Sequence, residues 1–550
     1  MKILQIGLII LLLTGSTGYA GDKDPTEWPT YAGGPDRLFF NPANTLITAA
    51  NVDRLQVKWS FPTDAIITAS PSVARLVIPG EGEIPVAFIQ SWDGNLYAIR
   101  VRDGTELWRF PTAPQLDASF PNAASVDVRR INGQQRVYFA AGETVYSLDA
   151  VTGEELWRFE AGTGCADPPG LCKSDSERNE VESSPIVADG KVFFGMDVND
   201  QEGGKGGFYA VDALDGRLVW FFDLETGATC RPFPEDNIRR FDGYHSEAEL
   251  GLPPRFLASR PSCHFDRTPT GCGNVWSSAA IDKGRRLLFF ASSNCNTDDD
   301  PATLKPPPPM PLYDEAIVAL RFDGTPAWRW RPREVDNNDL AFGAAPNLFT
   351  IRVRHRTRDV VGVGNKDGTY YVIDREGVNI VNGTHWDGSE PSTLPYWLKN
   401  VVLGGAIGGI IATAAVDEAA GRIYFSTAPG FDPSDPQQPT VHALDKNTGE
   451  ILWQSKGDAS FAPTSAIPGV VFVGSVGGFL RAFDAATGAM LTGVPVGFAV
   501  ASAPVVVDGI VIVGAGIGER TGNPQDPAEI SSRIPQNITA LCVPGTHYCP

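Results

Sequence analysis

The sequence is poor in the residues that mark several common kinds of site. Its 550 residues include only 8 Cys, 6 His and 4 Met, and they contain no CxxC pair and no CxxCH segment. A zinc site built on paired cysteines and a covalently attached c-type haem are therefore not expected. Positive charge is also scarce, with 45 Lys and Arg against 65 Asp and Glu and a net charge of −20. This balance argues against nucleic-acid binding and docking on anionic lipid, and it favours a basic partner protein.

Long apolar segments and sustained helical periodicity are absent as well. The longest apolar run, at 3–13, follows Lys2 and precedes small residues that end at Ala20. The run is too short to span a membrane stably, and the whole pattern is typical of a secretory signal. We predict a signal peptide over 1–20, a mature chain from about Gly21, a periplasmic or secreted location and no membrane anchor. The missing helical period disfavours a parallel βαβ fold.

Export would allow the cysteines to form disulfides. Cys165 and Cys172 are close enough in sequence to close a small loop, and so are Cys542 and Cys549. The other four lie in or beside the largest insertion, which we expect them to hold in place: Cys230, Cys263, Cys272 and Cys295. The sequence leaves the connectivity open.

The sequence is rich in one repeated phrase. In each copy an alternating apolar run leads to an Asp or a substitute, a Gly turn and usually a Trp. The copies are LYAIRVRDGTELW (96–108), VYSLDAVTGEELW (145–157), FYAVDALDGRLVW (208–220), IVALRFDGTPAW (317–328), YYVIDREG (370–377), VHALDKNTGEILW (441–453), LRAFDAATGAML (480–491) and ITALCVPG (538–545). Each predicts a strand, a tight turn and the start of the next strand. One such unit cannot bury its apolar face alone, so the copies must stack.

Two features near the ends indicate that the stack closes into a ring. ITALCVPG has no Trp strand after it, whereas DRLQVKWSF (53–61) is a Trp strand with no phrase before it. Pairing them completes the last blade and leaves no long exposed sheet edge. We predict an all-β fold, a single eight-bladed β-propeller over 21–550 with an insertion at about 223–273. A linear β-solenoid is the alternative. Repeated tryptophans are expected to lock neighbouring blades, namely Trp59, Trp108, Trp157, Trp220, Trp328 and Trp453.

Polar residues that interrupt the repeat are the candidates for chemistry. Trp276 stands away from the repeated Trp position and is either a core aromatic or a flat floor under a planar ligand. Asn294 ends an apolar strand and is either a turn former or a calcium ligand. Asp336 and Asp339, three residues apart, either shape a turn, bind a metal or abstract a proton.

Two further segments carry charge at turns. Lys366 begins a hairpin and is either solvated or placed to hold an electron-rich ligand oxygen as a point charge. An acidic, Gly-rich stretch at 195–212 contains Asp197, Asp200 and Glu202. It is either a flexible connection or a source of ligands for a hard cation.

The repeated xxAxDxxTGxxxW phrase resembles that of the pyrroloquinoline quinone (PQQ) dehydrogenase superfamily, over nearly all of the mature chain. NVWSSAAID (274–282) and FFASSNCN (289–296) resemble the family segment with a Trp beneath PQQ and an Asn on calcium, which implies these roles for Trp276 and Asn294. AWRWRPREVDNNDLAFG (327–343) resembles a Trp strand followed by an Asp-x-x-Asp pair. The resemblance implies that Asp339 is the catalytic base and also a ligand of the cation, with Asp336 at the cofactor.

Two more roles follow from the same resemblance. GNKDGTYYVIDR (364–375) resembles the segment whose basic residue bonds to the quinone oxygens, which implies that role for Lys366. The calcium-binding Glu of the family precedes the third phrase. Glu202 fits that ligand by its distance from the phrase, and Asp197 fits it by its place at a strand end.

The resemblance implies an exported dehydrogenase that oxidises an alcohol with PQQ and Ca²⁺ and passes electrons to a separate soluble cytochrome c. The general pattern is nearest to the polyvinyl-alcohol dehydrogenase branch. The chain departs from the methanol and ethanol enzymes because it has no adjacent Cys-Cys pair, and no cytochrome domain is fused to it. The alternative is a non-catalytic scaffold that binds a protein or a polymer, since propellers such as the outer-membrane assembly lipoprotein BamB share the repeat.

Overall fold

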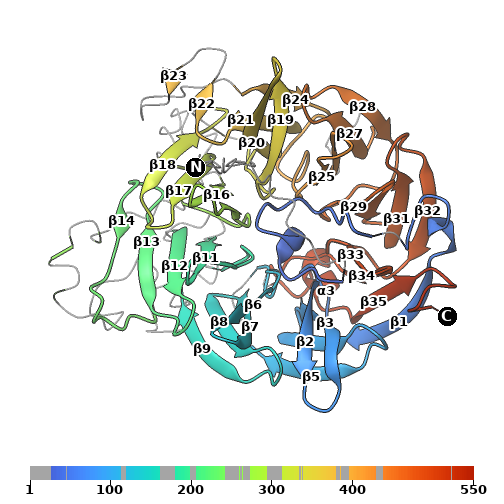
Figure 1. The fold of residues 1–550 in the computed structure, drawn as a ribbon, viewed down its shortest axis with the longest axis horizontal. Coiled ribbons are helices and arrows are strands. Elements are labelled where there is room, and N and C mark those ends of the chain that lie inside the picture. The colour runs from blue at the N-terminus through green and yellow to red at the C-terminus, as the bar shows by residue number, and fades with distance from the viewer. Residues whose placement is uncertain are drawn as a thin grey trace, which may run out of the picture.

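A computed structural model of the protein has eight antiparallel sheets arranged as blades around a central axis (Figure 1). The structure describes residues 26–44, 46–112, 119–161, 180–197, 206–241, 255, 259–260, 263, 273–293, 313–333, 336, 338–379, 384–385, 395–428, 438–521 and 523–549. The predicted all-β, eight-bladed propeller is confirmed.

Each blade is built on four antiparallel strands, the first of which lies nearest the axis. Blade 1 contains β2 (Ser72–Ile78), β3 (Gly82–Ser91), β4 (Asn95–Arg100) and β5 (Glu106–Pro111). Blade 2 contains β6 (Asp127–Ile131), β7 (Gln134–Ala141), β8 (Thr144–Asp149) and β9 (Glu155–Glu160). Blade 3 contains β10 (Ile186–Ala188), β11 (Lys191–Met196), β12 (Gly207–Asp212), β13 (Leu218–Phe222) and an added fifth strand, β14 (Thr229–Cys230). Blade 4 contains β15 (Ala280–Asp282), β16 (Leu287–Ala291), β17 (Ile317–Arg321) and β18 (Pro326–Trp330).

The second half of the ring repeats this order. Blade 5 contains β19 (Asn347–Val353), β20 (Arg356–Gly364), β21 (Thr369–Asp374) and β24 (Trp397–Asn400), with a small β22–β23 hairpin (Val378–Asn379, Thr384–His385) before its last strand. Blade 6 contains β25 (Ala415–Asp417), β26 (Arg422–Ser426), β27 (Val441–Asp445) and β28 (Ile451–Ser455). Blade 7 contains β29 (Ser465–Ile467), β30 (Val470–Gly474), β31 (Phe479–Asp484) and β32 (Met490–Pro495).

Blade 8 closes the ring by joining the two ends of the chain. It contains β33 (Val505–Val507), β34 (Ile510–Gly514), β35 (Gln536–Cys542) and, as its outermost strand, β1 (Gln56–Thr63). β1 pairs antiparallel with β35, and Trp59 lies opposite Ala540. Figure 1 shows the blue β1 beside the red β35. The predicted closure is therefore confirmed.

The repeated tryptophans join each blade to the next. The repeat itself forms the third strand and the following turn, and the Trp stands on the outer strand. Each indole N–H donates to a backbone carbonyl in the equivalent turn of the next blade, for Trp59, Trp108, Trp157, Trp220, Trp328, Trp397 and Trp453. The ring lies against that turn's glycine. At Gly153, where φ is +75°, a Cβ atom would stand 2.7 Å from the Trp108 ring. The predicted locking role is confirmed, and Trp397 joins the set.

Removal of one of these rings is expected to be costly. Trp157 is 3% exposed and donates to the Ala213 carbonyl of blade 3. Trp157→Ala should lower the free energy of unfolding by about 3–5 kcal/mol, because it leaves a cavity between two blades. Leu156→Ala on the exposed face of the same strand should change it by less than about 0.5 kcal/mol. Chemical denaturation of both variants measures the difference, and equal effects would contradict the locking role.

A belt formed by residues Trp28–Asn41 crosses the centre of the ring (Figure 1). Its backbone exchanges hydrogen bonds with the innermost strands of six blades, at Val73, Val128, Ile281, Leu348, Val416 and Ala466. The Asn41 side chain adds blade 8 by donating to the Val506 carbonyl. A short 3-10 turn, η1 (Tyr31–Gly33), brings Tyr31 to the axis, where its hydroxyl lies 2.9 Å from Thr413 Oγ1. The belt therefore fills the channel across most of the ring.

Two disulfides are described. Cys542 bonds to Cys549, as the sequence allowed, and Cys230 of β14 bonds to Cys263 inside the predicted insertion. The remaining cysteines lie outside the described residues: Cys165, Cys172, Cys272 and Cys295. The helices whose bounds lie within the described residues are η1, η2 (Val52–Arg54) and α3 (Pro527–Ser532). Within the described part of the chain, no helix has the length and apolar character needed to cross a membrane.

The loops on the two faces of the ring differ in length. With one exception, connections between successive blades, and between the second and third strands of a blade, emerge on one face. They include long segments such as 292–316 and 515–535. The exception is the connection after β14, which runs antiparallel to β13 and ends on the opposite face, where Arg231 donates to the Asp323 carbonyl of the β17–β18 turn. The other connections on that opposite face are tight turns, apart from the segment that carries the β22–β23 hairpin. The predicted site residues that the structure describes belong to the long-loop face or to the strand ends that meet it, namely Asp197, Trp276, Asp336, Asp339 and Lys366.

Candidate active site

A ring of Ser and Thr hydroxyl groups links neighbouring blades at the mouth of the channel. Just before the innermost strands, a backbone N–H of one blade donates to a Ser or Thr hydroxyl of the next. The bonds run from Ala503 to Ser70, from Ser70 to Ser125, from Ser125 to Ser184, from Ser184 to Ser278 and from Ala345 to Thr413. These bonds fix the start of each inner strand against its neighbour. In successive blades, the residue two positions before each of these Ser, Thr or Ala residues therefore stands at the same height along the channel axis.

Residues at that level line a cavity on the channel axis. They are Thr68, Ala123, Glu182, Trp276, Gly343, Ile411, Phe461 and Ala501, with Tyr31 of the belt also in the lining. Four of the eight are small, so space remains above the belt. The indole of Trp276 and the carboxyl group of Glu182 stand at equivalent positions of blades 4 and 3. Sequence reasoning missed Glu182. Its signal was the recurring small-residue segment before each inner strand, ESSPIV (182–187) in blade 3 and WSSAAI (276–281) in blade 4.

Trp276 is held by close packing and lies beside a positive charge. Gly343 of the next blade lets the ring approach, since a Cβ atom there would stand 2.2 Å from Trp276 Cη2. Lys366 Nζ lies 5.6 Å from the centre of the ring, within the range of a cation–π interaction. A flat aromatic surface with an ammonium group nearby suits a planar, anionic ligand.

Lys366 also forms an ion pair with Asp339. Lys366 Nζ donates to Asp339 Oδ1 at 2.8 Å, and the side chains are 12% and 38% exposed. Asp339 has φ of +51°, a conformation that Asp tolerates better than most residues. Asp336 supports this turn by accepting from the Leu340 N–H at 2.5 Å and the Asn338 N–H at 2.9 Å. Burial raises the pKa of Asp339, and the Lys366 charge opposes that rise.

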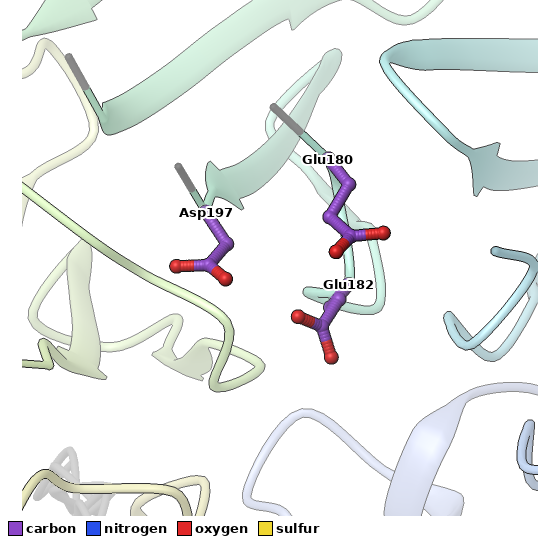
Figure 2. Close-up of side chains that lie close together, drawn as sticks. All are labelled: Glu180, Glu182 and Asp197. Atoms are coloured by element: carbon purple, nitrogen blue, oxygen red, sulfur yellow. The ribbon is translucent and has the colours of Figure 1, made fainter. Parts of the chain in front are cut away.

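A group of three carboxylates lies on the blade 3 side of the cavity. Glu180, Glu182 and Asp197 each place an oxygen within 4.8 Å of the others. Figure 2 shows the three side chains pointing toward one another from two adjacent chain segments. Backbone hydrogen bonds of 2.8 Å in both directions between Glu180 and Asp197 hold those segments together. Two of the three carboxylates were not among the residues singled out from the sequence.

The proximity of these carboxylates opposes their ionisation. Burial raises the pKa of Glu182 well above its usual value, and the nearby Glu180 and Asp197 raise it further. A cluster of three carboxylates at this distance shares a proton unless a cation neutralises its negative charge. Carboxylate oxygens are the ligands that Ca²⁺ prefers, so the donor set fits a hard cation.

The structure therefore brings together part of the predicted site. Trp276, Lys366 and Asp339 meet at one end of the channel. Asp197 of blade 3 lies next to Glu182, which lines the same cavity as Trp276. The described contacts of Asp336 support its own loop, and its role at the cofactor remains a prediction. Asn294 and Glu202 lie outside the described residues, so their roles as cation ligands also remain predictions.

Comparison with known proteins supplies the family. Residues 28–382 match the model described as "Glucose/ethanol/alcohol dehydrogenase, beta-propeller domain", a PQQ family, and residues 437–523 match the model of the outer membrane protein assembly factor BamB. The first match covers more than half of the chain. The protein belongs to the PQQ-dependent alcohol dehydrogenase-like β-propeller family. Its β-propeller is thus the family fold, and its named relatives are oxidoreductases.

Individual relatives agree with this assignment. A polyvinylalcohol dehydrogenase from Pseudomonas sp is 25% identical over 85% of this chain and 67% of its own length. One from Sphingopyxis sp. (strain 113P3) is 24% identical over 82% of this chain and 64% of its own length. The quinohemoprotein alcohol dehydrogenase of Comamonas testosteroni is 24% identical over 60% of this chain and 42% of its own length. The chain thus spans about two thirds or less of these relatives.

Two solved structures show the same fold. A europium-containing methanol dehydrogenase superposes with a TM-score of 0.69 at 16% identity, covering 95% of this chain and 99% of that one. The quinohemoprotein alcohol dehydrogenase from Comamonas testosteroni gives 0.65 at 20% identity, covering 96% of this chain and 82% of that one.

The residues present fit the family's cofactor. Gly343 leaves room for an indole that is held flat, and small residues keep the cavity above the belt open. The ammonium group of Lys366 and the carboxylates of blade 3 lie on different sides of this space, which suits a quinone and its cation.

Proposed function

We propose that this protein is an exported quinoprotein dehydrogenase that oxidises an alcohol with PQQ and Ca²⁺ and passes electrons to a separate acceptor. The observation that carries the proposal is the arrangement at the channel mouth. An aromatic ring with an adjacent Lys–Asp pair stands on one side, and a cluster of carboxylates stands on the other. The matched family and its named relatives support the same reaction class.

Each side chain has a distinct task in this proposal. When bound, PQQ accepts a hydride from the alcohol carbon and so takes up two electrons. Trp276 supports the cofactor plane, and Lys366 donates toward quinone oxygens. Asp339 accepts the hydroxyl proton, which its half-buried carboxylate can do while Lys366 orients it. Asp197 and Glu182 hold the cation, with Glu180, Asn294 and Glu202 as further candidate ligands.

A titration tests the function directly. PQQ is added with Ca²⁺ to the purified mature protein, quinone absorbance is followed, and dye reduction is measured with primary, secondary and polymeric alcohols. Polyvinyl alcohol belongs in the panel because two relatives are named for it. Saturable binding with alcohol-dependent dye reduction is the expected result. Absence of saturable PQQ binding would overturn the proposal.

The cation should stabilise the protein more as pH rises. The pKa of Glu182 is higher in the folded state than in the unfolded state, so folding takes up a proton. The cation-free protein therefore loses stability as pH rises from the usual carboxyl pKa to the raised pKa of Glu182. Ca²⁺ requires ionised ligands and relieves their repulsion. At 100 times its dissociation constant, it should add about 2.7 kcal/mol. Thermal melts at pH 5 and pH 8 with Ca²⁺ or chelator measure this.

Variants of one carboxylate make that test specific. Glu182→Gln should remove most of the Ca²⁺ stabilisation at pH 8. Asp282→Asn is the matched control, because Asp282 is also buried and is paired with Arg285 and Arg375 on the opposite face of the ring. Equal Ca²⁺ stabilisation in Glu182→Gln and the wild type would place the cation elsewhere.

The location and the acceptor complete the proposal. The disulfides are consistent with an oxidising compartment, so we place the mature protein in the periplasm or outside the cell. The net charge of −20 favours a basic soluble cytochrome c as the acceptor. A non-catalytic scaffold is the second candidate, favoured by the match of 437–523 to BamB. The PQQ titration separates the two, because a scaffold would bind no PQQ.

A further inference from the structure

Arg333 is bonded beside the Asp339–Lys366 pair, and its described hydrogen bonds and ion pairs go to other residues. It follows β18, in the same connection as Asp339. Its guanidinium donates to the Leu340 carbonyl at 3.2 Å and forms ion pairs with Glu315 and Asp367. Leu340 follows Asp339 in the chain, and Asp367 follows Lys366. One side chain is therefore bonded next to both members of the pair.

Leu340, the residue after Asp339, is held at both of its backbone polar groups. Its N–H is bound by the Asp336 carboxylate at 2.5 Å, and its carbonyl is bound by Arg333. This matters because Asp339 has φ of +51°, a conformation with an energetic cost that surrounding contacts must maintain. The two contacts fix the direction in which the Asp339 carboxylate leaves the backbone.

The anchors of Arg333 are themselves fixed. Glu315 is fully buried, and its backbone N–H donates to the Ser293 carbonyl at 2.7 Å in blade 4. Asp367 accepts from the Tyr371 hydroxyl at 2.6 Å and the Thr369 N–H at 2.8 Å in blade 5. Arg333 thus joins three connections of the long-loop face, and a planar guanidinium with several donors suits such a junction.

We infer that Arg333 is a positioning residue that sets the geometry of the Asp339–Lys366 pair by joining Leu340, Glu315 and Asp367. This inference rests on the proposed function for its effect on turnover, but its structural consequence does not. Substrate and cofactor binding should depend little on Arg333, whereas proton acceptance by Asp339 should depend strongly on it. Small displacements of an acid or base can cost about 100-fold in rate.

Arg333→Met and Arg333→Lys test the inference, with Arg375→Met as the control. Arg375 also bridges a carboxylate, Asp282, and a carbonyl, Phe349, but on the opposite face of blade 5. Arg333→Met should lower kcat about 10–100-fold, with KM for the alcohol and Kd for PQQ within about threefold. Arg333→Lys should recover part of the loss, and Arg375→Met should keep kcat within about twofold despite reduced thermal stability.

Crystal structures of the apoprotein give a readout independent of activity. In Arg333→Met the Asp339–Lys366 contact should open, whereas it should persist in Arg375→Met. An intact contact in Arg333→Met, or equal losses of kcat in Arg333→Met and Arg375→Met, would overturn the inference. If the wild type binds no PQQ, the proposed function fails while the crystallographic comparison still decides the role of Arg333.

Discussion

Asp339→Asn should lower alcohol-dependent turnover by about 10²–10⁴-fold while leaving PQQ affinity nearly unchanged, because a general base contributes a factor of this size. Asparagine is the sharpest replacement here. It keeps the shape of the side chain and an oxygen for Lys366, and it tolerates the φ of +51° that Asp339 adopts. Only the ability to accept a proton is removed. Single-turnover reduction of the PQQ-loaded protein by an alcohol measures the step without interference from the acceptor.

A matched control for this variant lies on the same face of the ring. Asp458 is bound by Arg481, and its side chain is 36% exposed, against 38% for Asp339. Asp458→Asn should leave turnover within about twofold of the wild type. Turnover retained in Asp339→Asn would exclude it as the base. A loss of PQQ affinity as large as the loss of turnover would instead indicate that the carboxylate supports the cofactor site.

The architecture was predictable because the repeat encodes contacts between neighbours. An apolar strand, a Gly turn and a Trp recur because each indole packs on the glycine of the next turn, as Trp108 does on Gly153. That contact needs the same residue types in each blade, so it leaves a periodic trace in the sequence. Trp397 escaped notice because the β22–β23 hairpin and its flanks separate it from its repeat.

The site was predictable only where a residue broke the pattern visibly. Trp276, Asp339 and Lys366 stand out from their surroundings, and the structure places them together. Glu180 and Glu182 looked like ordinary polar residues of a connection. Their importance comes from backbone pairing of Glu180 with Asp197, a contact across a connection that has no sequence period. Arg333 was missed for the same reason, since its partners come from three separate connections.

The belt was missed because it has no repeat at all. The belt binds through backbone hydrogen bonds to the inner strands, which the hydroxyl ring already aligns. Its Trp28 and Phe39 are buried, and Arg37 is fully buried with bonds to the carbonyls of Ala279 and Tyr31. A segment that binds through backbone groups needs little periodicity in its side chains. The contribution of the belt to stability is therefore visible in the structure and not in the sequence.

Deletion of residues 26–41 is expected to abolish cooperative folding of the mature chain. The deletion removes backbone partners from six blades and the Asn41 side-chain partner from blade 8, and it exposes apolar side chains of the main core. We expect the resulting loss of free energy to exceed the marginal stability of a folded protein, about 5–15 kcal/mol. Circular dichroism melts of the deleted chain and of one beginning at Gly21 measure the effect. A deleted chain that melts with the same sharp transition would show that the blades close without the belt.

A point variant makes the same test quantitative. Arg37→Met should lower the free energy of unfolding by about 3–5 kcal/mol, because it leaves buried carbonyls without their donor and leaves Arg129 as the positive charge beside the buried Asp127. Arg54→Met is the control, since Arg54 is exposed and should matter by less than about 0.5 kcal/mol. Tyr31 of the belt also lines the cavity. Arg37→Met should therefore weaken PQQ binding as well, and unchanged affinity would separate the belt's part in folding from any part in the site.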